Sequence, residues 1–403
     1  MSKNANYFGQ PIFSQLLKFI PHENVRSIAQ DFQSDRYIKR FTTYQHLVSL
    51  LYSSFHQCSS LREIVTGMMA CHGKLQHLGM ADYPKRSTLS DANKRRPAEV
   101  FEAIYFDLFK RYASFLSDSP SPGLIDKRLY IVDSTTISLF SDILRNAGQI
   151  PKSGKRKGGL KAHVLINAVE DVPCLVRMTK ASASDSPFLK DIKLPQNSVL
   201  VFDRGYNNFA QYERLSQDKI TWITRERATT AVEITEETRV NDQEKLQGVI
   251  GDQTVILGNT SNKRQLRVNA RRILFYDQTS QKTFSFLTNN RQMKASTIAQ
   301  LYQRRWQVEV LFKRLKQNSQ LKYFLGENQN AIKIQVWCAL IADLLTKIVQ
   351  KQVKRKWSFA NLSSMLRIHL MTYTSLHRFL NDPIKCLEKN LVTQPQLSLF
   401  SSA

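Results

Sequence analysis

Residues 297–318 are the part of the sequence that most constrains the fold, and they read TIAQLYQRRWQVEVLFKRLKQN. The stretch contains no glycine or proline, so it predicts one unbroken helix of several turns. At roughly 100° per residue, one sector of this helix is apolar and forms a face for a hydrophobic core. The apolar residues are Leu301, Val308, Leu311, Phe312 and Leu315. Arg304 points into the same sector and is the exception to the pattern.

A column of polar side chains lies beside that apolar sector. It contains Tyr302, Arg305, Glu309 and Lys316, which fall within an arc of roughly 60° on the helical wheel. Taken alone, the column is typical of a solvated helix face on which Glu309 offsets the charges of its basic neighbours. It also fits a carboxylate that is held beside two cations and a phenol at the edge of a buried face.

Two upstream stretches favour a functional interpretation of the column. Asp133 follows the apolar run in LYIVDSTTI, and Asp203 follows the apolar run in NSVLVFDRGY. Because the carboxyl ends of strands in an α/β sheet line the ligand crevice, we expect both aspartates to lie in one site. With Glu309 they form a set of hard oxygen ligands for two Mg²⁺ ions, with Mn²⁺ as a substitute. The sequence therefore predicts these three carboxylates as catalytic residues and metal ligands for phosphoryl transfer.

These motifs resemble those of a known protein family. Tyr302-x2-Arg305-x3-Glu309-x6-Lys316 is similar to the Y-R-E-K signature of the insertion-sequence-four family of DDE transposases. The DST at Asp133 and the DRGY at Asp203 resemble the two aspartate motifs of that family, in the same order. The three motifs bracket residues 124–320. Residues 7–93 resemble, more loosely, an N-terminal domain that is attached to some of these transposases.

The resemblance implies a DNA transposase that cuts the ends of an insertion sequence and joins them to target DNA. It implies that Asp133 bridges two metal ions and that Asp203 and Glu309 each hold one. Tyr302, Arg305 and Lys316 would then bind DNA phosphates. The implied partners are double-stranded DNA, as transposon ends and as target, and a second copy of the chain in a homodimeric synaptic complex.

Two other functions stay open at the level of the sequence. A structure-specific DNA nuclease with the same fold would cut DNA and join nothing. A non-catalytic DNA-binding relic would keep the charge and the fold and lose a metal ligand. All three carboxylates are present, which argues against the relic.

The order of the predicted elements indicates an α/β fold. Three consecutive strands followed by alternating helix and strand is the order of a ribonuclease H-like sheet, and the resemblance implies that fold. We expect the catalytic core over residues 124–225 and 295–325, with a β-rich insertion over 226–294. An all-helical N-terminal domain (1–117), a helical C-terminal region (326–392) and a disordered tail (393–403) flank it.

The N-terminal domain is a candidate for binding DNA ends. We expect three short helices there, and the last of them carries Lys94, Arg95 and Arg96. Such a trio fits a helix-turn-helix DNA reader. A structural helical cap that touches no bases is the alternative.

Positive charge dominates the composition. The 403 residues include 58 Lys and Arg against 33 Asp and Glu, a formal net charge of +25. This excess fits a polyanionic partner and excludes an ordinary metabolic enzyme. No apolar run is long enough to span a membrane, no cleavable leader opens the chain, and the five cysteines form no CxxC pair. We therefore expect a cytoplasmic protein, and the resemblance to insertion-sequence transposases implies a bacterial one that is associated with the nucleoid.

A basic, glycine-rich segment, PKSGKRKGGLK, separates the first two predicted strands. We expect Lys155, Arg156, Lys157 and Lys161 to contact DNA phosphates, together with Arg204 of the DRGY motif. A solvated run of charges is the alternative. His163, on the second predicted strand, faces either the metal site or the core as a hydrogen-bonded histidine.

Overall fold

The described residues of the computed structural model (9–118, 124–138, 159–258, 267–319, 321 and 323–386) divide into two units. Met1–Tyr112 and Arg314–Ala403 form a helical unit, and Ala113–Lys313 form an α/β unit. The N-terminal and C-terminal helical regions thus belong to one unit, although the sequence pattern treats them separately. Three residues of the predicted basic loop (Lys155, Arg156 and Lys157) and the predicted tail lie outside the described residues.

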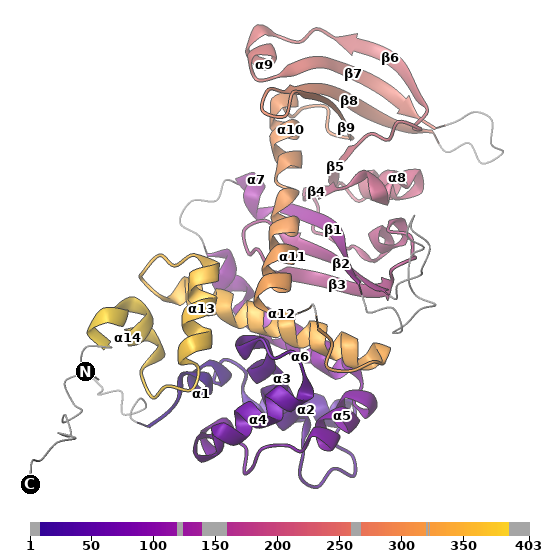
Figure 1. The fold of residues 1–403 in the computed structure, drawn as a ribbon. Helices are drawn as coiled ribbons and strands as arrows, with labels where there is room; N and C mark the ends of the chain where they lie inside the picture. Colours follow the sequence, from indigo (N-terminus) through magenta and orange to yellow (C-terminus); the bar gives the residue numbers. More distant parts are fainter. Residues whose placement is uncertain are drawn as a thin grey trace, which may run out of the picture. The chain divides into compact units, whose positions relative to one another are not determined.

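The α/β unit is built on one mixed sheet. Nine strands of the described residues form it, in the order β3-β2-β1-β4-β5-β9-β8-β7-β6 (Figure 1). The strands are β1 (Leu129–Ser138), β2 (Gly159–Asn167), β3 (Pro173–Lys180), β4 (Val199–Phe202), β5 (Thr221–Arg225), β6 (Val232–Thr238), β7 (Val249–Leu257), β8 (Val268–Asp277) and β9 (Lys282–Thr288). β1 pairs antiparallel with β2 and parallel with β4, and β4 pairs parallel with β5. The predicted α/β class is confirmed.

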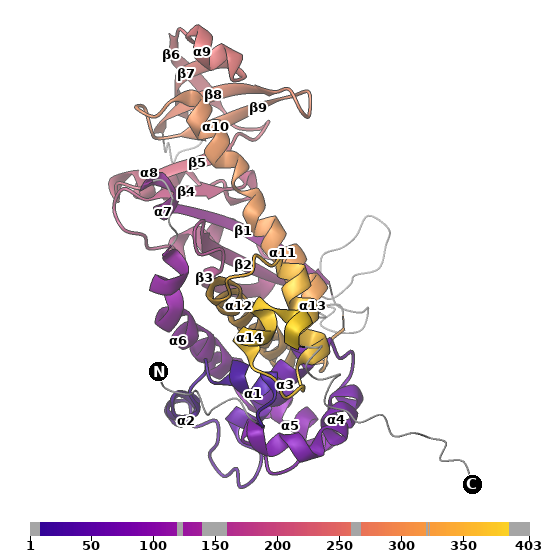
Figure 2. The same cartoon turned by 90° about the vertical axis from the view of Figure 1, so that its left-hand side faces the viewer.

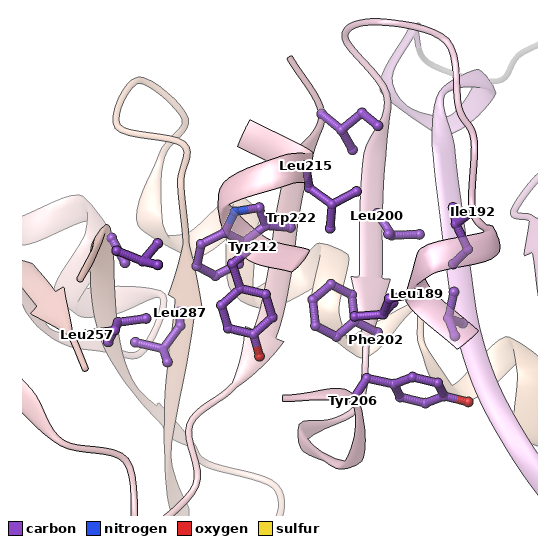
Figure 3. Close-up of a cluster of buried hydrophobic side chains, with 14 of the residues drawn as sticks. Leu189, Ile192, Leu200, Phe202, Tyr206, Tyr212, Leu215, Trp222, Leu257 and Leu287 are labelled. Atoms are coloured by element: carbon purple, nitrogen blue, oxygen red, sulfur yellow. The ribbon is translucent and has the colours of Figure 1, made fainter. Parts of the chain in front are cut away.

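Helices cover both faces of the central strands. The helices of this unit are α7 (Leu124–Lys127), η3 (Ser186–Asp191), η4 (Arg204–Tyr206), α8 (Phe209–Gln217), α9 (Asp242–Leu246), α10 (Ala295–Gln303) and the first part of α11 (Trp306–Asn318), of which α9 packs on β7 near the end of the sheet. α8 and α10 lie on either side of β4 and β5 in both views (Figures 1 and 2). Trp222 of β5 stacks on Tyr212 of α8 with ring centroids 4.5 Å apart, and Leu200 and Phe202 of β4 join the same buried cluster (Figure 3). Packing in this cluster determines which side chains of β4 and β5 point into the core.

The region predicted as a β-rich insertion contains β6 to β9, all antiparallel to their neighbours. These strands extend the same sheet, since β9 pairs with β5 through Thr224 and Leu287. One short helix, α9, was not predicted. Asn241 caps it by accepting a hydrogen bond from the Glu244 N–H at 2.8 Å, an arrangement that is favoured at helix starts.

The helix predicted over residues 297–318 is broken, and the prediction of one continuous helix was wrong. α10 ends at Gln303 and α11 begins at Trp306, with a tight turn at Arg304 and Arg305. The backbone N–H groups of Arg305 and Gln307 bond to carbonyls only three residues back, which narrows the turn. Arg304, the exception in the apolar sector, leaves that sector and pairs with Asp126 at 2.9 Å.

The helical unit is organised around α12. Its other elements are α1 (Ile12–Leu17), α2 (His22–Asp31), α3 (Thr43–His56), α4 (Leu61–Ala70), η1 (His72–Leu78), α5 (Arg86–Arg95), α6 (Ala98–Ser117), α13 (Phe359–His369) and α14 (Leu376–Asn381), with α12 at Gln329–Gln352. α12 packs against α3, α5 and α13, and it is buried along most of its length. Contact on several sides explains why its sequence is apolar all round.

The predicted last helix over 359–380 is also broken, into α13 and α14. The carbonyls of Leu370 and Thr372 in the connection accept hydrogen bonds from the N–H groups of Phe13 and Ile12. These carbonyls accept hydrogen bonds from the first residues of α1, so they do not accept the backbone hydrogen bonds that would continue α13. Ser375 then caps α14.

The basic residues of the predicted third helix, α5, are partly exposed and partly buried. Lys94 and Arg95 are exposed, and Arg95 pairs with Asp91 at 2.8 Å. Arg96, just after the helix, is buried and donates hydrogen bonds to Asp35 and to the Phe41 carbonyl. Arg96 is therefore a structural residue, which leaves Lys94 and Arg95 as the exposed cations at the end of α5.

A buried ion pair anchors α11 to α12 within the helical unit. Arg314 Nε and Nη2 donate to the two carboxylate oxygens of Asp343 at 2.7 and 2.9 Å, and the guanidinium lies 4.6 Å from the Phe359 ring centroid. Asp343 interrupts the most apolar run of the sequence. No helix among the described residues is both long and apolar enough to cross a membrane.

Candidate active site

Asp133 and Asp203 lie beside each other where the parallel pairing of β1 with β4 ends. Asp203 directly follows β4, but β1 stays paired with β2 as far as Ser138, so the expectation that Asp133 ends its strand was wrong. β1 and β4 pair in register up to Val132 and Phe202, and each aspartate is the next residue along its chain. Val132 and Phe202 point into the buried cluster under α8 and η3. Because side chains alternate along a strand, both aspartates point to the opposite face.

Arg305 connects Asp133 to the catalytic candidate on α11. Its Nη1 donates to Asp133 Oδ2 at 2.5 Å, and its Nη2 donates to Glu309 Oε1 at 2.7 Å. The side chains of Arg305 and Asp133 are only 12% and 15% exposed, so water screens this contact weakly. The structure thus brings together the strand aspartates and the helix glutamate of the predicted site, despite the break before α11.

The electrostatics of the site are those of crowded carboxylates. Burial raises the pKa of Asp133 to about 6; Arg305 opposes this rise, and the charges of Asp203 and Glu309 add to it. Burial acts to lower the pKa of Arg305, but Asp133 and Glu309 outweigh it and leave that pKa raised, so the guanidinium stays charged. Negative charge accumulates here beyond what one arginine offsets, which is the environment that attracts cations.

Tyr302 is a buried member of the same group. Its ring lies 4.8 Å from that of Phe286, and its hydroxyl is 3.5 Å from Asp203 Oδ1. Burial and the neighbouring Asp203 charge raise the pKa of Tyr302 to about 12, so the hydroxyl stays protonated. In this arrangement Tyr302 is a packed aromatic whose polar end faces a catalytic candidate.

Comparison with known proteins agrees with this geometry. Residues 125–345 match the family described as Transposase DDE domain, and the matched stretch is more than half of the chain. The chain belongs to the Transposase DDE domain family. Its function is that of a DNA transposase. Residues 8–81 match a second family, described as a domain of unknown function (DUF4372).

Curated relatives with transposase names support the same assignment. A Sinorhizobium fredii protein named transposase y4zB is 31% identical over 273 residues, which are 66% of this chain and 72% of the relative. A Synechocystis protein named as the transposase for insertion sequence element IS4SA is 26% identical over 272 residues, 65% of this chain and 71% of the relative. A Geobacillus stearothermophilus protein named as the transposase for insertion sequence element IS5377 is 25% identical over 342 residues, 84% of this chain and 85% of the relative.

Sequence reasoning missed Trp306 as a candidate in this transposase. Its side chain is 61% exposed at the start of α11, and the Arg305 guanidinium lies 5.7 Å from its ring centroid. Exposed aromatic rings next to cations can stack nucleic acid bases. The helical wheel gave no signal for it, because Trp306 lies outside both the apolar sector and the polar column.

The other residues that were predicted to contact DNA differ in how far they are exposed to solvent. Arg204 is exposed directly after Asp203. Lys316 is exposed seven residues after Glu309 on α11, and partial burial lowers its pKa. Lys161 is buried, and its Nζ donates to the Ala183 carbonyl at 2.9 Å and to Asp185 at 3.0 Å. His163 takes the second of its two predicted positions, as a hydrogen-bonded buried histidine.

The donor set suits a hard divalent cation. Carboxylate oxygens are the ligands that Mg²⁺ prefers. Burial is the main reason that the pKa of Asp133 is raised, and the charges of Asp203 and Glu309 add to the rise. Among the described residues, no three His, Cys, Asp or Glu side chains form a group that could hold a metal ion as they stand. Arg305 lies between two of the three carboxylates. The fit of this site to a divalent cation therefore rests on the type of its donor atoms and on where the fold places them.

Proposed function

We propose that this transposase cuts the ends of an insertion sequence and joins them to target DNA by metal-dependent phosphoryl transfer. The observation that carries the proposal is the Arg305 bridge between Asp133 and Glu309, with Asp203 at the adjacent strand end. Such a site needs no covalent intermediate, because positioning and charge stabilisation perform most of the catalysis of phosphoryl transfer. The proposal also includes a ribonuclease H-like fold for the catalytic core and membership of the transposase family that carries the Y-R-E-K signature.

Asp133, Asp203 and Glu309 would hold the divalent cations. When bound, Mg²⁺ or Mn²⁺ supplies charge that stabilises the attacking and leaving oxygens of the displacement. Arg305 matches the two-pronged geometry of carboxylate and of phosphate alike. It can therefore exchange its contacts with Asp133 and Glu309 for the oxygens of a DNA phosphate, which frees both carboxylates.

The DNA itself would be held by cations and aromatic rings near this site. Arg204 and Lys316 are exposed and suit phosphate contacts, and Trp306 suits stacking on a base at the DNA end. Lys155, Arg156 and Lys157 stay predictions for the same role. We expect two copies of the chain to hold the two ends together, and the mass of the complex with end DNA tests this. Action on chromosomal DNA also favours the nucleoid as its place in the cell.

A joining assay tests the proposed function. The probe is a double-stranded DNA that carries the terminal inverted repeats flanking the gene, incubated with a supercoiled target plasmid and Mg²⁺. We expect both cut ends and end–plasmid joints. Cutting without joints would assign a nuclease activity instead. Absence of both products, with the DNA bound, would contradict the proposed chemistry.

We expect cleavage to require Mg²⁺ or Mn²⁺, and Ca²⁺ to support DNA binding without turnover. Ca²⁺ takes more ligands at longer distances, so it holds the reacting oxygens less tightly in line. The measurement is nicking of end DNA beside gel-shift affinity in each ion. Robust nicking in chelator, or with Ca²⁺ alone, would remove the metal from the proposal.

Arg305 is the residue for which a catalytic and a surface role predict different results. We expect Arg305→Ala to slow end cleavage by about 100-fold or more, the range seen when one charge-stabilising donor is removed from an active site. Arg305→Lys should also be slow, because the point charge of an ammonium cannot reproduce the two-pronged contact of a guanidinium with a phosphate. Lys316→Ala should weaken affinity for end DNA.

The matched control for these variants is Arg111→Ala, which removes an exposed arginine that also pairs with a carboxylate four residues away. Thermal melting checks that all the proteins are folded. Wild-type cleavage rates and DNA affinities in Arg305→Lys, Arg305→Ala and Lys316→Ala would show that these residues take no part in cleavage or DNA binding.

A further inference from the structure

A buried polar cluster lies on the other side of β1 from the catalytic candidates. Asp133 and Ser134 are consecutive in β1, so their side chains point to opposite faces of the sheet. Ser134 is the register partner of His163 on β2, and Lys161 lies two residues earlier on the same face. With Asp185 and Tyr206 these residues form what we call the Asp185 cluster.

Asp185 is the centre of this cluster. Its Oδ1 accepts hydrogen bonds from Ser134 Oγ and from Lys161 Nζ, both at 3.0 Å. His163 Nδ1 lies 3.5 Å from the same oxygen. Asp185 stands at the start of η3, yet its side chain makes no capping hydrogen bond to that helix. Its carboxylate is directed to the strands instead.

His163 connects Asp185 to the turn after β4. Its Nδ1 is 3.3 Å from the Tyr206 hydroxyl, its Nε2 is 2.9 Å from Thr179 Oγ1, and its ring stacks on Phe188. Burial lowers the pKa of His163 to about 4, so the ring stays neutral. Every polar atom of the ring has a neighbour, which fixes its orientation.

The Asp185 cluster touches the segments that carry both catalytic aspartates. Asp133 Oδ1 accepts the Ser134 N–H at 2.8 Å, and the Ser134 hydroxyl donates to Asp185. Asp203 Oδ2 accepts the Gly205 N–H at 3.2 Å. A Cβ placed on Gly205 would lie 3.2 Å from Asp185 Oδ2 and 3.6 Å from Asp203 Oδ2. Asp185 therefore bonds to Ser134, whose N–H orients Asp133, and lies close to Gly205, whose N–H orients Asp203.

We propose that Asp185 is a positioning residue that holds Asp133 and Asp203 in the orientation in which they bind divalent cations. It acts through Ser134 on β1 and through the Gly205–Tyr206 turn after β4. Lys161 offsets its charge, which allows a fourth carboxylate close to a site already crowded with negative charge. The inference rests on the proposed function, since it assigns metal binding to the same aspartates.

The test compares Asp185→Asn with Asp191→Asn. Both changes remove one carboxylate charge from the η3 segment, but Asp191 pairs with Arg177 and contacts neither Ser134 nor the Gly205–Tyr206 turn. The readout is the melting temperature of the DNA-free protein as Mn²⁺ or Ca²⁺ is added. Loss of a group that orients metal ligands typically weakens metal affinity by about 10- to 100-fold. We expect that shift of the half-maximal metal concentration for Asp185→Asn and none for Asp191→Asn.

End cleavage by Asp185→Asn should fall and recover in part at high Mn²⁺. Ser134→Ala removes a single hydroxyl, and Gly205→Ala pushes a methyl between two carboxylates. Both should shift the metal midpoint in the same direction, so they decide the question if Asp185→Asn does not fold. An unchanged midpoint in the folded variants, even with a lowered melting temperature, would reduce Asp185 to a structural role.

The two proposals fail in different ways. Wild-type protein that gains stability from metal but cleaves no end DNA would contradict the proposed function while the Asp185 comparison still stands. Wild-type protein that gains no stability from either ion would overturn the positioning role of Asp185.

Discussion

Replacing Asp133 with Asn, Asp203 with Asn or Glu309 with Gln is expected to lower end cleavage by about 1,000-fold or more, since metal-supplied charge stabilisation is worth several kcal/mol. Each change keeps the shape of the side chain and removes the anionic oxygen that would hold a cation. DNA affinity comes mostly from Lys and Arg contacts with phosphates. It should therefore stay near the wild-type value, or rise slightly, because a negative charge close to the DNA is lost.

Nicking and gel-shift affinity should be measured on the same protein preparations. Glu213→Gln is the matched control, because Glu213 is an exposed carboxylate of α8 in the same unit. The control should cleave like the wild type. Full cleavage by a folded Glu309→Gln protein would exclude Glu309 from the site, whereas loss of DNA binding in all three variants would point to a structural defect.

The sequence predicts well that the two aspartates lie side by side, because the signal is local, although β1 continues past Asp133 to Ser138. Asp133 and Asp203 each follow an apolar run, and parallel pairing of two such runs places both on one edge of the sheet. The five strands from β1 to β5 follow the same logic. In each case a few neighbouring residues determine the outcome.

The sequence does not predict features that depend on distant partners. The break between α10 and α11 involves Arg304 and Arg305, whose side chains bond to Asp126 and Asp133 more than a hundred residues away. The Asp185 cluster is another example, because the stretch SASDSPF around Asp185 matches no motif. Its hydrogen bonds with Ser134 of β1 and Lys161 of β2 appear only in the folded chain.

The Arg314–Asp343 pair carries the largest stability effect that we expect from one side chain. The two side chains are only 7% and 3% exposed, so both charges are almost removed from water. Removing one partner of a buried pair leaves the other charge without compensation, which typically costs about 3–5 kcal/mol. We therefore expect Asp343→Ala to lower the free energy of unfolding of the helical unit by about that amount.

Asp91→Asn in α5 is the matched control, because it breaks an exposed pair with Arg95 in the same unit, and such pairs contribute about 0.3–0.5 kcal/mol. The measurement is urea unfolding followed by circular dichroism. The double variant Arg314→Met with Asp343→Leu should recover most of the loss, since a buried pair can be replaced by apolar side chains of similar volume. If Asp343→Ala were no more destabilising than Asp91→Asn, the pair would not anchor α11, the helix that also carries Glu309.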